Sequence, residues 1–349
     1  MADFSWIAEE DELSLAALTV LAQTVDPTDN GQLLWDIFFP RANVDSVDLK
    51  DLFTLDDRPA ADRREWNQRG RFIPILTPEQ RLMSMVPIEG YDKIDEYEMQ
   101  KLEEGTFGNE DVVRRVIGVR IPDRVERIAM ADYRRLELDA FKAWATGTIV
   151  QKNPQKGNTY TASFGFDSGR YQTASPTWVA AANAYDEFLA WVEDGISEIG
   201  PVAGVALRRA TYKEILADAP DLPMGVKMTR SQLEDRIQQD LGSPFNFFEL
   251  ENTVDEFTDG GIATTSTKIW AAEQVALVPT GNAVGRAAFA PVRRAMELAR
   301  QVPGAGIDVR GVTIYYESSN GGRELTIEGQ LNAMPIPNEQ KMWVIDAGV

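Results

Sequence analysis

The sequence predicts an α+β fold with one long helix, a mixed α/β segment and several strands near the C-terminal end. Three observations lead to this prediction. Apolar residues recur every three or four positions over residues 122–146, which is the period of one helix face. Short apolar runs alternate with helical patterns between residues 176 and 305. After residue 312, apolar and polar residues alternate as they do in half-buried strands.

Composition limits the chemistry. The chain has 349 residues, 44% of them hydrophobic, and eight tryptophans, which is typical of a folded protein with a buried core. It has no His and no Cys, so Ser-His-Asp and Cys-His nucleophiles, the usual zinc ligands and disulfides are excluded. A net charge of −20 argues against binding a nucleic-acid backbone. Without an 18-residue apolar run, or a basic residue before Arg41, we expect a soluble chain that starts in the cytoplasm.

The N-terminal 40 residues contain eight acidic side chains and no basic one, a local charge of −8. One amphipathic helix is predicted behind the acidic cluster at residues 9–12, ending at VDPTDNG (25–31). Its apolar residues are Ile7, Leu13, Leu15, Leu18, Val20 and Leu21. Two interpretations stay open: a solvated terminal helix, which we favour, or an arm that lies on a partner.

Residues 58–71 reverse this charge, with five arginines against Asp62 and Glu65, a local charge of +3. The segment after it is apolar and β-branched but is broken by three prolines at positions 74, 78 and 87, which favours a projecting hairpin or an edge strand. Such a hairpin cannot bury its own apolar side chains, so we expect another chain to cover them. They are Phe72, Ile73, Ile75, Leu76, Met83, Met85 and Val86.

The long helix is predicted to begin at Pro122 and to end at Gly147, with a length of roughly 36 Å at 1.5 Å per residue. An upstream segment, 109–120, could extend it across a kink at Pro122. The apolar face consists of Val125, Ala129, Tyr133, Leu136, Ala140 and Trp144. Ion pairs are expected on the remaining surface: Arg135 with Asp139, Arg134 with Glu137, and Asp139 with Lys142.

The rest of the chain alternates between the two kinds of element. A hairpin is predicted from TIVQ and TYTASFGF around the turn KNPQKGN (152–158). A helix follows over 175–195, with Ser175 as cap, Pro176 as first helical residue and Gly195 as terminator. Strand and helix patterns then predict an α/β lobe over 176–305. Closing strands are predicted over 312–319, 324–336 and 341–347.

Three stretches carry a resemblance to a known family. YRRLELDAFKAWATGTIVQ (133–151) resembles the end of that family's spine helix entering a small hairpin. KIWAAEQVALVPTGNAVG (268–285) and LNAMPIPNEQKMWVIDA (331–347) are similar to its V-x-L-x-P-x-G turn and its C-terminal run. The order of elements as a whole resembles the major capsid proteins of tailed phages, in particular the lambda-like E family with the Hong Kong 97-type fold.

The resemblance implies a division of the chain: an N-terminal arm (1–49), an extended E-loop hairpin (50–95), a P domain with the spine helix (96–175 and 306–349) and an A domain (176–305). It also implies self-assembly into hexamers and pentamers of an icosahedral head that encloses double-stranded DNA. The protein would be a virion component assembled in the bacterial host cytoplasm, without cofactor, enzymatic activity or membrane. A separate scaffolding protein is expected, because no scaffolding segment precedes the arm. A portal and a decoration protein are further candidate partners.

Opposite charges on identical subunits favour head-to-tail contacts that close into rings. The basic hairpin and the acidic arm are therefore the candidate intersubunit contacts. They are Arg58, Arg63, Arg64, Trp66, Arg69, Arg71, Phe72, Ile73, Ile75, Met83, Met85, Glu9, Glu10, Asp11 and Glu12. Residues 51–92 contain no Lys, so we expect no covalent Lys–Asn mesh of the kind that some relatives form through this loop.

Two alternatives remain. The first is an encapsulin-like cellular shell that holds an enzyme in place of DNA, which the neighbouring genes would distinguish. The second is a carboxylate-based hydrolase that uses adjacent acids, although such pairs arise by chance among 55 acidic residues. The candidate acids are Asp56 with Asp57, Glu103 with Glu104, and Asp255 with Glu256. GNAVG (281–285) lacks the Lys and Ser/Thr of a phosphate-binding loop and is interpreted as a turn.

Overall fold

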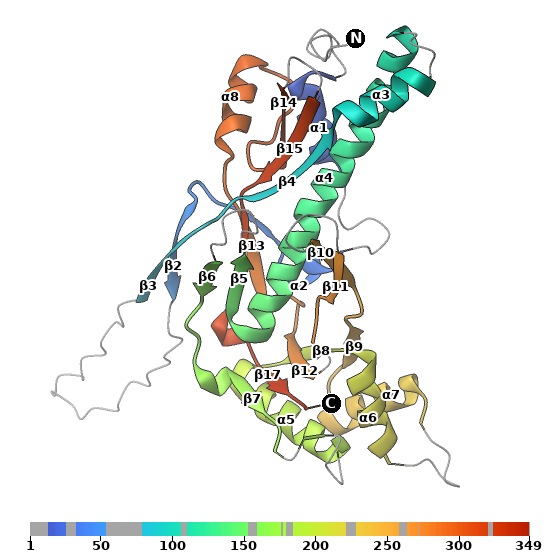
Figure 1. Cartoon of the computed structure of the whole chain (residues 1–349). Coiled ribbons are helices and arrows are strands. Elements are labelled where there is room, and N and C mark those ends of the chain that lie inside the picture. The colour runs from blue at the N-terminus through green and yellow to red at the C-terminus, as the bar shows by residue number, and fades with distance from the viewer. Residues whose placement is uncertain are drawn as a thin grey trace, which may run out of the picture.

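The subunit is elongated, with an upper end, a middle and a lower lobe in the orientation of Figure 1. The long helix α4 runs from the upper end into the middle, and the hairpin β2–β3 stands to one side of the body. This computed structural model describes residues 13–25, 33–53, 79–105, 110–152, 159–175, 177–178, 184–220, 228–257, 264–271, 273–319 and 324–348.

Helix α4 spans Glu110–Thr146, or 37 residues, and is about 55 Å long at 1.5 Å per residue. The helix does not begin at Pro122, as first predicted, but continues through this proline from the upstream segment that was given as a possible extension. Pro122 removes one backbone hydrogen bond, but the burial of Ile117, Ile121 and Val125, each at most 1% exposed, offsets the loss. The predicted apolar face is confirmed, since all six of its residues are between 0% and 5% exposed.

The upper end is a three-stranded antiparallel sheet in the order β14 (Thr313–Ser319), β15 (Glu324–Leu331), β4 (Ile88–Ile94). Helix α4 packs against β15 and β4, and α3 (Glu96–Gly105) packs against α4. In β15 every second residue is buried, as the alternating sequence predicted. Helix α8 (Arg293–Gln301) lies at the same end of the subunit (Figure 1).

Helix α1 (Leu15–Thr24) completes this end, with Ser14 as its cap. It packs against β14 and α4, and it buries Leu18 and Ala22 at 1% and 0% exposure. Thr19 Oγ1 accepts a hydrogen bond from Ile314 N at 3.2 Å, so α1 is also tied to the backbone of β14. Both interpretations of the N-terminal helix were wrong for these residues, because α1 belongs to the core of its own subunit.

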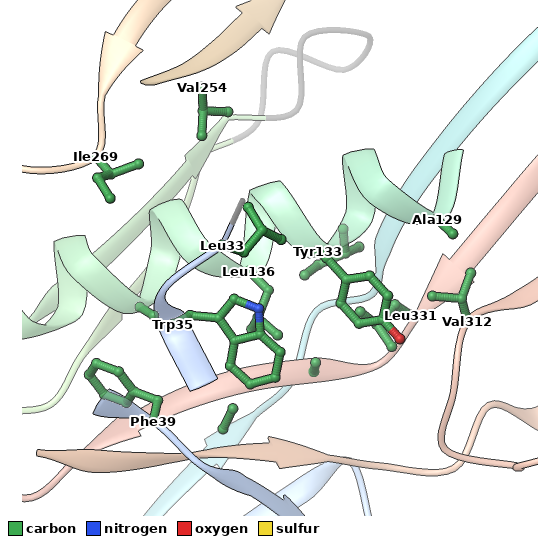
Figure 2. Close-up of a cluster of buried hydrophobic side chains, with 14 of the residues drawn as sticks. Leu33, Trp35, Phe39, Ala129, Tyr133, Leu136, Val254, Ile269, Val312 and Leu331 are labelled. Atoms are coloured by element: carbon green, nitrogen blue, oxygen red, sulfur yellow. The ribbon is translucent and has the colours of Figure 1, made fainter. Parts of the chain in front are cut away.

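The next segment is also part of the core. It contains α2 (Trp35–Phe38) and β1 (Arg41–Asn43), which pairs in parallel with β13 (Gly285–Phe289). Strand β13 pairs in turn with β16 (Ala333–Pro337). Phe38 and Phe39 are at most 1% exposed, and Trp35 stacks beside Tyr133 of α4 with ring centroids 6.5 Å apart (Figure 2). The described part of the predicted arm, 1–49, therefore contributes several side chains to the core of its own subunit.

The lower lobe is built on a five-stranded sheet in the order β7, β17, β12, β8, β9. The strands span Tyr171–Thr173, Val344–Asp346, Gln274–Pro279, Val202–Leu207 and Asn246–Glu249. Helices α5 (Ala184–Ile199), α6 (Arg209–Asp218) and α7 (Arg230–Leu241) share a second apolar core with this sheet. The lobe does not coincide with the predicted 176–305, because β13 and α8 lie with the middle and upper end, whereas β7 and β17 come from outside that range.

Both predicted ends of the helix over 175–195 differ from the structure. Helix α5 begins at Ala184, well after Ser175, and it continues past Gly195 to Ile199. Pro176, the predicted first residue, lies outside the described residues. A Cβ at Gly195 would come within 2.2 Å of Leu277 Cδ1 and 2.6 Å of Trp343 Cδ1. The glycine therefore lets α5 approach the sheet closely. Its position near the predicted end of the helix had suggested a terminator and not this packing role.

Short antiparallel hairpins account for the remaining strands. The predicted hairpin after α4 is confirmed as β5 (Thr148–Lys152) with β6 (Thr159–Ser163). Strand β10 (Thr253–Phe257) pairs with β11 (Thr264–Lys268), and β2 (Asp48–Phe53) pairs with β3 (Glu79–Ser84). Short 3₁₀ turns follow at Ser168–Arg170 and Glu339–Lys341.

Candidate functional site

The hairpin β2–β3 is the part of the subunit that stands farthest from the helices and sheets of the body in Figure 1. Its strands pair from Asp48 opposite Ser84 to Phe53 opposite Glu79. The structure describes the backbone of Met83 in β3. The other predicted hairpin contacts, Arg58, Arg63, Arg64, Trp66, Arg69, Arg71, Phe72, Ile73 and Ile75, lie outside the described residues and stay predictions. The same holds for Glu9, Glu10, Asp11 and Glu12.

The base of the hairpin is held by apolar packing. Leu49 and Met85 are 7% and 6% exposed and share a small buried cluster with Ile149, Ala162 and Phe164 of the β5–β6 region. Met85 N also donates a hydrogen bond to Val47 O at 2.9 Å. The prediction for Met85 needs correction, because its own chain already covers this side chain. Val86, the next residue, remains 36% exposed.

A polar contact holds the hairpin base from the other side. Arg310 Nε donates to Val44 O at 3.0 Å, and Arg310 Nη2 lies 2.7 Å from Asp45 Oδ1. Arg310 belongs to the segment between α8 and β14, far along the chain from the hairpin. The direction in which β2–β3 leaves the body is thus fixed from within the subunit. Both anchors depend on pairs of residues that sequence reasoning did not connect.

Exposed apolar side chains also occur where β4, α3 and the first half of α4 pack together. Tyr91 and Tyr97 are 63% and 65% exposed, and Val119 is 65% exposed. Lys101 Nζ lies 4.4 Å from the centroid of the Tyr97 ring, which leaves the ring partly covered by a cation. Sequence analysis did not single out these residues, although alternation along β4 indicates that Tyr91 points away from α4.

Helix α4 carries three buried carboxyl groups, and two of them, Glu137 and Asp139, were predicted to form ion pairs on its exposed surface. Asp132, Glu137 and Asp139 are each 1% exposed. The predicted pair of Arg135 with Asp139 is confirmed at 2.9 Å, although Asp139 is buried. Glu137 does not face solvent, since its Oε1 accepts a hydrogen bond from Leu34 N at 2.6 Å. Other segments of the same chain therefore cover more of the α4 surface than the distribution of its charged residues predicts.

Glu137 links three separate segments. Besides Leu34, it hydrogen-bonds the side chain of Asn252, from the turn before β10. Burial raises the pKa of the Glu137 carboxyl to about 7, although the bonds from Leu34 and Asn252 and the charge of Arg134 oppose the shift. A carboxyl with this pKa changes charge close to neutral pH, so the contact of the N-terminal segment with α4 is sensitive to pH.

Replacing Glu137 with Gln is expected to flatten the dependence of stability on pH. The carboxyl has a higher pKa in the folded chain than its ordinary value of 4.5, so the folded chain binds an extra proton between pH 4.5 and about 7. Its contribution to stability is complete below pH 4.5 and is lost as the pH rises through 7. The wild-type chain should lose about 2–3 kcal/mol of unfolding free energy over this range that the variant keeps.

Urea unfolding of the unassembled subunit at pH 5 and pH 8.5 measures this difference. Glu126→Gln is the matched control, because Glu126 is exposed on the same helix. The expectation is contradicted if Glu137→Gln and Glu126→Gln give the same pH profile.

The acids proposed for a hydrolase do not converge on one site among the described residues. Asp255 is exposed on β10, and the side chain of Glu256 lies outside the described residues. Glu104 is exposed on α3 and accepts a hydrogen bond from Gln100. Asp56 and Asp57 lie outside the described residues, as does the side chain of Glu103. GNAVG forms a turn, with positive φ at Gly281 and Asn282.

The described residues contain no cluster of three or more acidic side chains arranged to hold a metal ion. None of their helices combines the length and the apolar character that crossing a membrane requires.

The fold of this chain is similar to the folds of known proteins. No protein-family model and no curated protein matches the chain. Among solved structures, the putative capsid protein of a prophage of Escherichia coli CFT073 is similar at 13% identity and a TM-score of 0.54, over 93% of this chain and 96% of that one. A phage-related protein of Bordetella bronchiseptica RB50 is similar at 15% identity and a TM-score of 0.50, over 95% and 96%. The likeness extends over nearly the whole of each chain, lobes and long helix included.

Proposed function

We propose that this chain, which has the fold of the prophage capsid protein compared above, is the major capsid protein of a tailed phage. The observation that carries the proposal is the length of the likeness, which covers 93% of this chain and 96% of that capsid protein. A likeness confined to one lobe would fit many functions, whereas this one extends over nearly the whole of both chains. Its role is structural, with contacts between subunits in place of a reaction centre.

The contacts of such a shell are made by the hairpin in this proposal. Its base is fixed by the Leu49–Met85 packing and by Arg310, so β2 and β3 leave the body in a defined direction. Residues 58–71, which follow β2 in the sequence, would meet a neighbouring subunit. The arginines of residues 58–71 give the tip a local charge of +3, and the acidic cluster at residues 9–12 offers a complementary surface on another copy. Contacts of this head-to-tail kind close into rings, as hexamers and pentamers require.

The net negative charge of the chain is compatible with a shell that encloses DNA. At −20, the chain repels phosphate on average, so packaged double-stranded DNA would be held without tight binding to the shell. In this proposal the protein is part of the virion and assembles in the host cytoplasm. Its partners are a separate scaffolding protein, a portal and a decoration protein.

Assembly is the direct test. The full chain is expressed with its neighbouring genes, and the product is analysed by size-exclusion chromatography and negative-stain electron microscopy. Megadalton icosahedral particles are the expected result. A stable monomer at all concentrations would refute the proposal, and particles that hold a protein cargo without DNA would favour the cellular shell.

Charge reversal at Arg63 and Arg64 is expected to block assembly without unfolding the subunit. Glu at both positions changes the local charge of residues 58–71 from +3 to −1, which removes the attraction to the acidic cluster of a neighbour. The double variant Arg63→Lys/Arg64→Lys keeps the charge and is expected to assemble. Circular dichroism checks folding and electron micrographs count particles; a normal particle yield from the Glu variant rules out this contact.

A further inference from the structure

We propose that the contact between α4 and the β4–β15 pair is a proton-controlled joint, closed while Asp132 is neutral and loosened when Asp132 ionises. This inference concerns the single subunit and does not rest on the proposed function. It arises from the place where the long helix lies closest to the upper sheet.

Two glycines make this close approach possible. Gly90 of β4 and Gly329 of β15 lie directly opposite each other in the strand register. A Cβ at Gly329 would come within 2.4 Å of Ile128 Cγ2 on α4, so no larger residue fits there without moving the helix. At Ile128, one turn before Asp132, the helix therefore packs directly against the backbone of the two glycines.

The carboxyl of Asp132 spans this glycine pair. Its Oδ1 lies 3.1 Å from the position that a Cβ of Gly90 would take, and its Oδ2 lies 3.2 Å from the equivalent position at Gly329. Asp132 is 1% exposed, and Oδ2 has no hydrogen-bond partner among the described residues. A charged carboxylate in this place would lack both water and a compensating donor, which is the most costly state for a buried acid.

The charged groups around the joint do not neutralise Asp132. Glu89 of β4 is the acidic neighbour that disfavours its charged form. Asp92 on the same strand is held by Arg124 at 2.9 Å, and Arg135 of α4 is held by Asp139. Helix α1, which also packs on α4, contains no charged residue. The far side of the sheet carries Glu328 and Tyr315, with Arg294 of α8 above the Tyr315 ring.

Burial, reinforced by Glu89, raises the pKa of Asp132 well above its ordinary value. The folded chain therefore holds a proton that the unfolded chain has lost. The closed joint has its full stability at low pH and loses stability as the pH rises through the folded-state pKa. Once the pH exceeds the ordinary pKa of an aspartate, separation of α4 from Gly90 and Gly329 admits water to the carboxyl group, and its proton passes to solvent.

Hydrogen exchange measured by mass spectrometry on the full chain tests the joint. Asp132→Asn mimics the neutral acid, and both chains carry Glu137→Gln so that this second buried acid does not contribute. In the chain with Asp132, protection of amides in β4, β15 and residues 125–135 is expected to fall about tenfold per pH unit between the ordinary pKa of an aspartate and the raised pKa of the closed joint, and to level off above it, after correction for intrinsic exchange. In the Asn chain the protection of these amides is expected not to change with pH. Equal pH profiles in the two chains overturn the proposal.

A second measurement detects the protonation state of Asp132 directly. Infrared difference spectra of the two folded chains, recorded about one pH unit above the ordinary pKa of an aspartate, are expected to show a protonated carboxylic acid band that the Asn chain lacks. If that band is absent, Asp132 is ionised inside the closed joint and the proposal fails. If the Asn chain does not fold, Asp132→Leu takes its place in both measurements, and Asp123→Asn, exposed on the same helix, serves as the surface control.

Discussion

Deletion of residues 2–25 is expected to leave a chain that does not fold. It removes Leu13, Leu18 and Ala22, which are at most 5% exposed, and it uncovers the faces of β14 and α4 on which α1 lies. Each fully buried Leu contributes about 1.5–3 kcal/mol, and the bond between Thr19 and Ile314 is lost as well. The total is comparable with the roughly 5–15 kcal/mol that stabilises a whole domain.

The matched control is deletion of residues 2–12, which removes the acidic cluster but keeps Leu13 and the Ser14 cap of α1. This shorter deletion is expected to give a folded subunit with native circular dichroism. Cooperative unfolding in urea distinguishes the two chains. A folded, soluble subunit lacking residues 2–25 would show that α1 is dispensable to the core.

Replacing Trp144 with Ala is expected to cost about 3–5 kcal/mol of unfolding free energy. Trp144 is fully buried at the C-terminal end of α4, where its ring lies 5.0 Å from Phe38 and 5.1 Å from Trp270 between centroids. Phe141 stacks on it from the preceding turn at 6.1 Å. The cavity would therefore open between three segments that are distant in the sequence: α2, α4 and the residues after β11.

Trp144→Phe is the control for this substitution. It keeps an aromatic ring in the cluster and removes an indole N–H that has no hydrogen-bond partner among the described residues. Its cost is expected to be less than half that of Trp144→Ala. Urea midpoints of the unassembled subunits give both values. Equal losses for Phe and Ala would show that the ring packing is not what stabilises this site.

Periodic patterns in the sequence were the most reliable guide to the fold. The face of α4 from Val125 to Trp144 was predicted residue by residue, because a helix that buries one stripe must repeat it every three to four positions. The closing strands and the β5–β6 hairpin were found in the same way. Resemblance in the order of these elements also led to the fold that the comparisons show.

Residues whose partners are distant in the chain were not predictable in this way. The apolar stripe of α1 is visible in the sequence, but the surface that covers it includes Ile314, 295 residues from Thr19. Glu137 has the pattern of a surface ion pair with Arg134, yet Leu34 and Asn252 enclose it. Gly195 has the position of a helix terminator, whereas Leu277 and Trp343 determine its role.

The sequence by itself determined the periodic elements, the segregation of charge between residues 1–40 and 58–71, and the absence of His and Cys chemistry. These properties depend on local order and composition, which the chain carries in any conformation. Only the tertiary structure decided that the N-terminal segment is core, that Met85 is covered by its own chain and that Asp132 lies over Gly90 and Gly329. Burial and pKa depend on which distant residues come together, and that information is absent from any single stretch of the sequence.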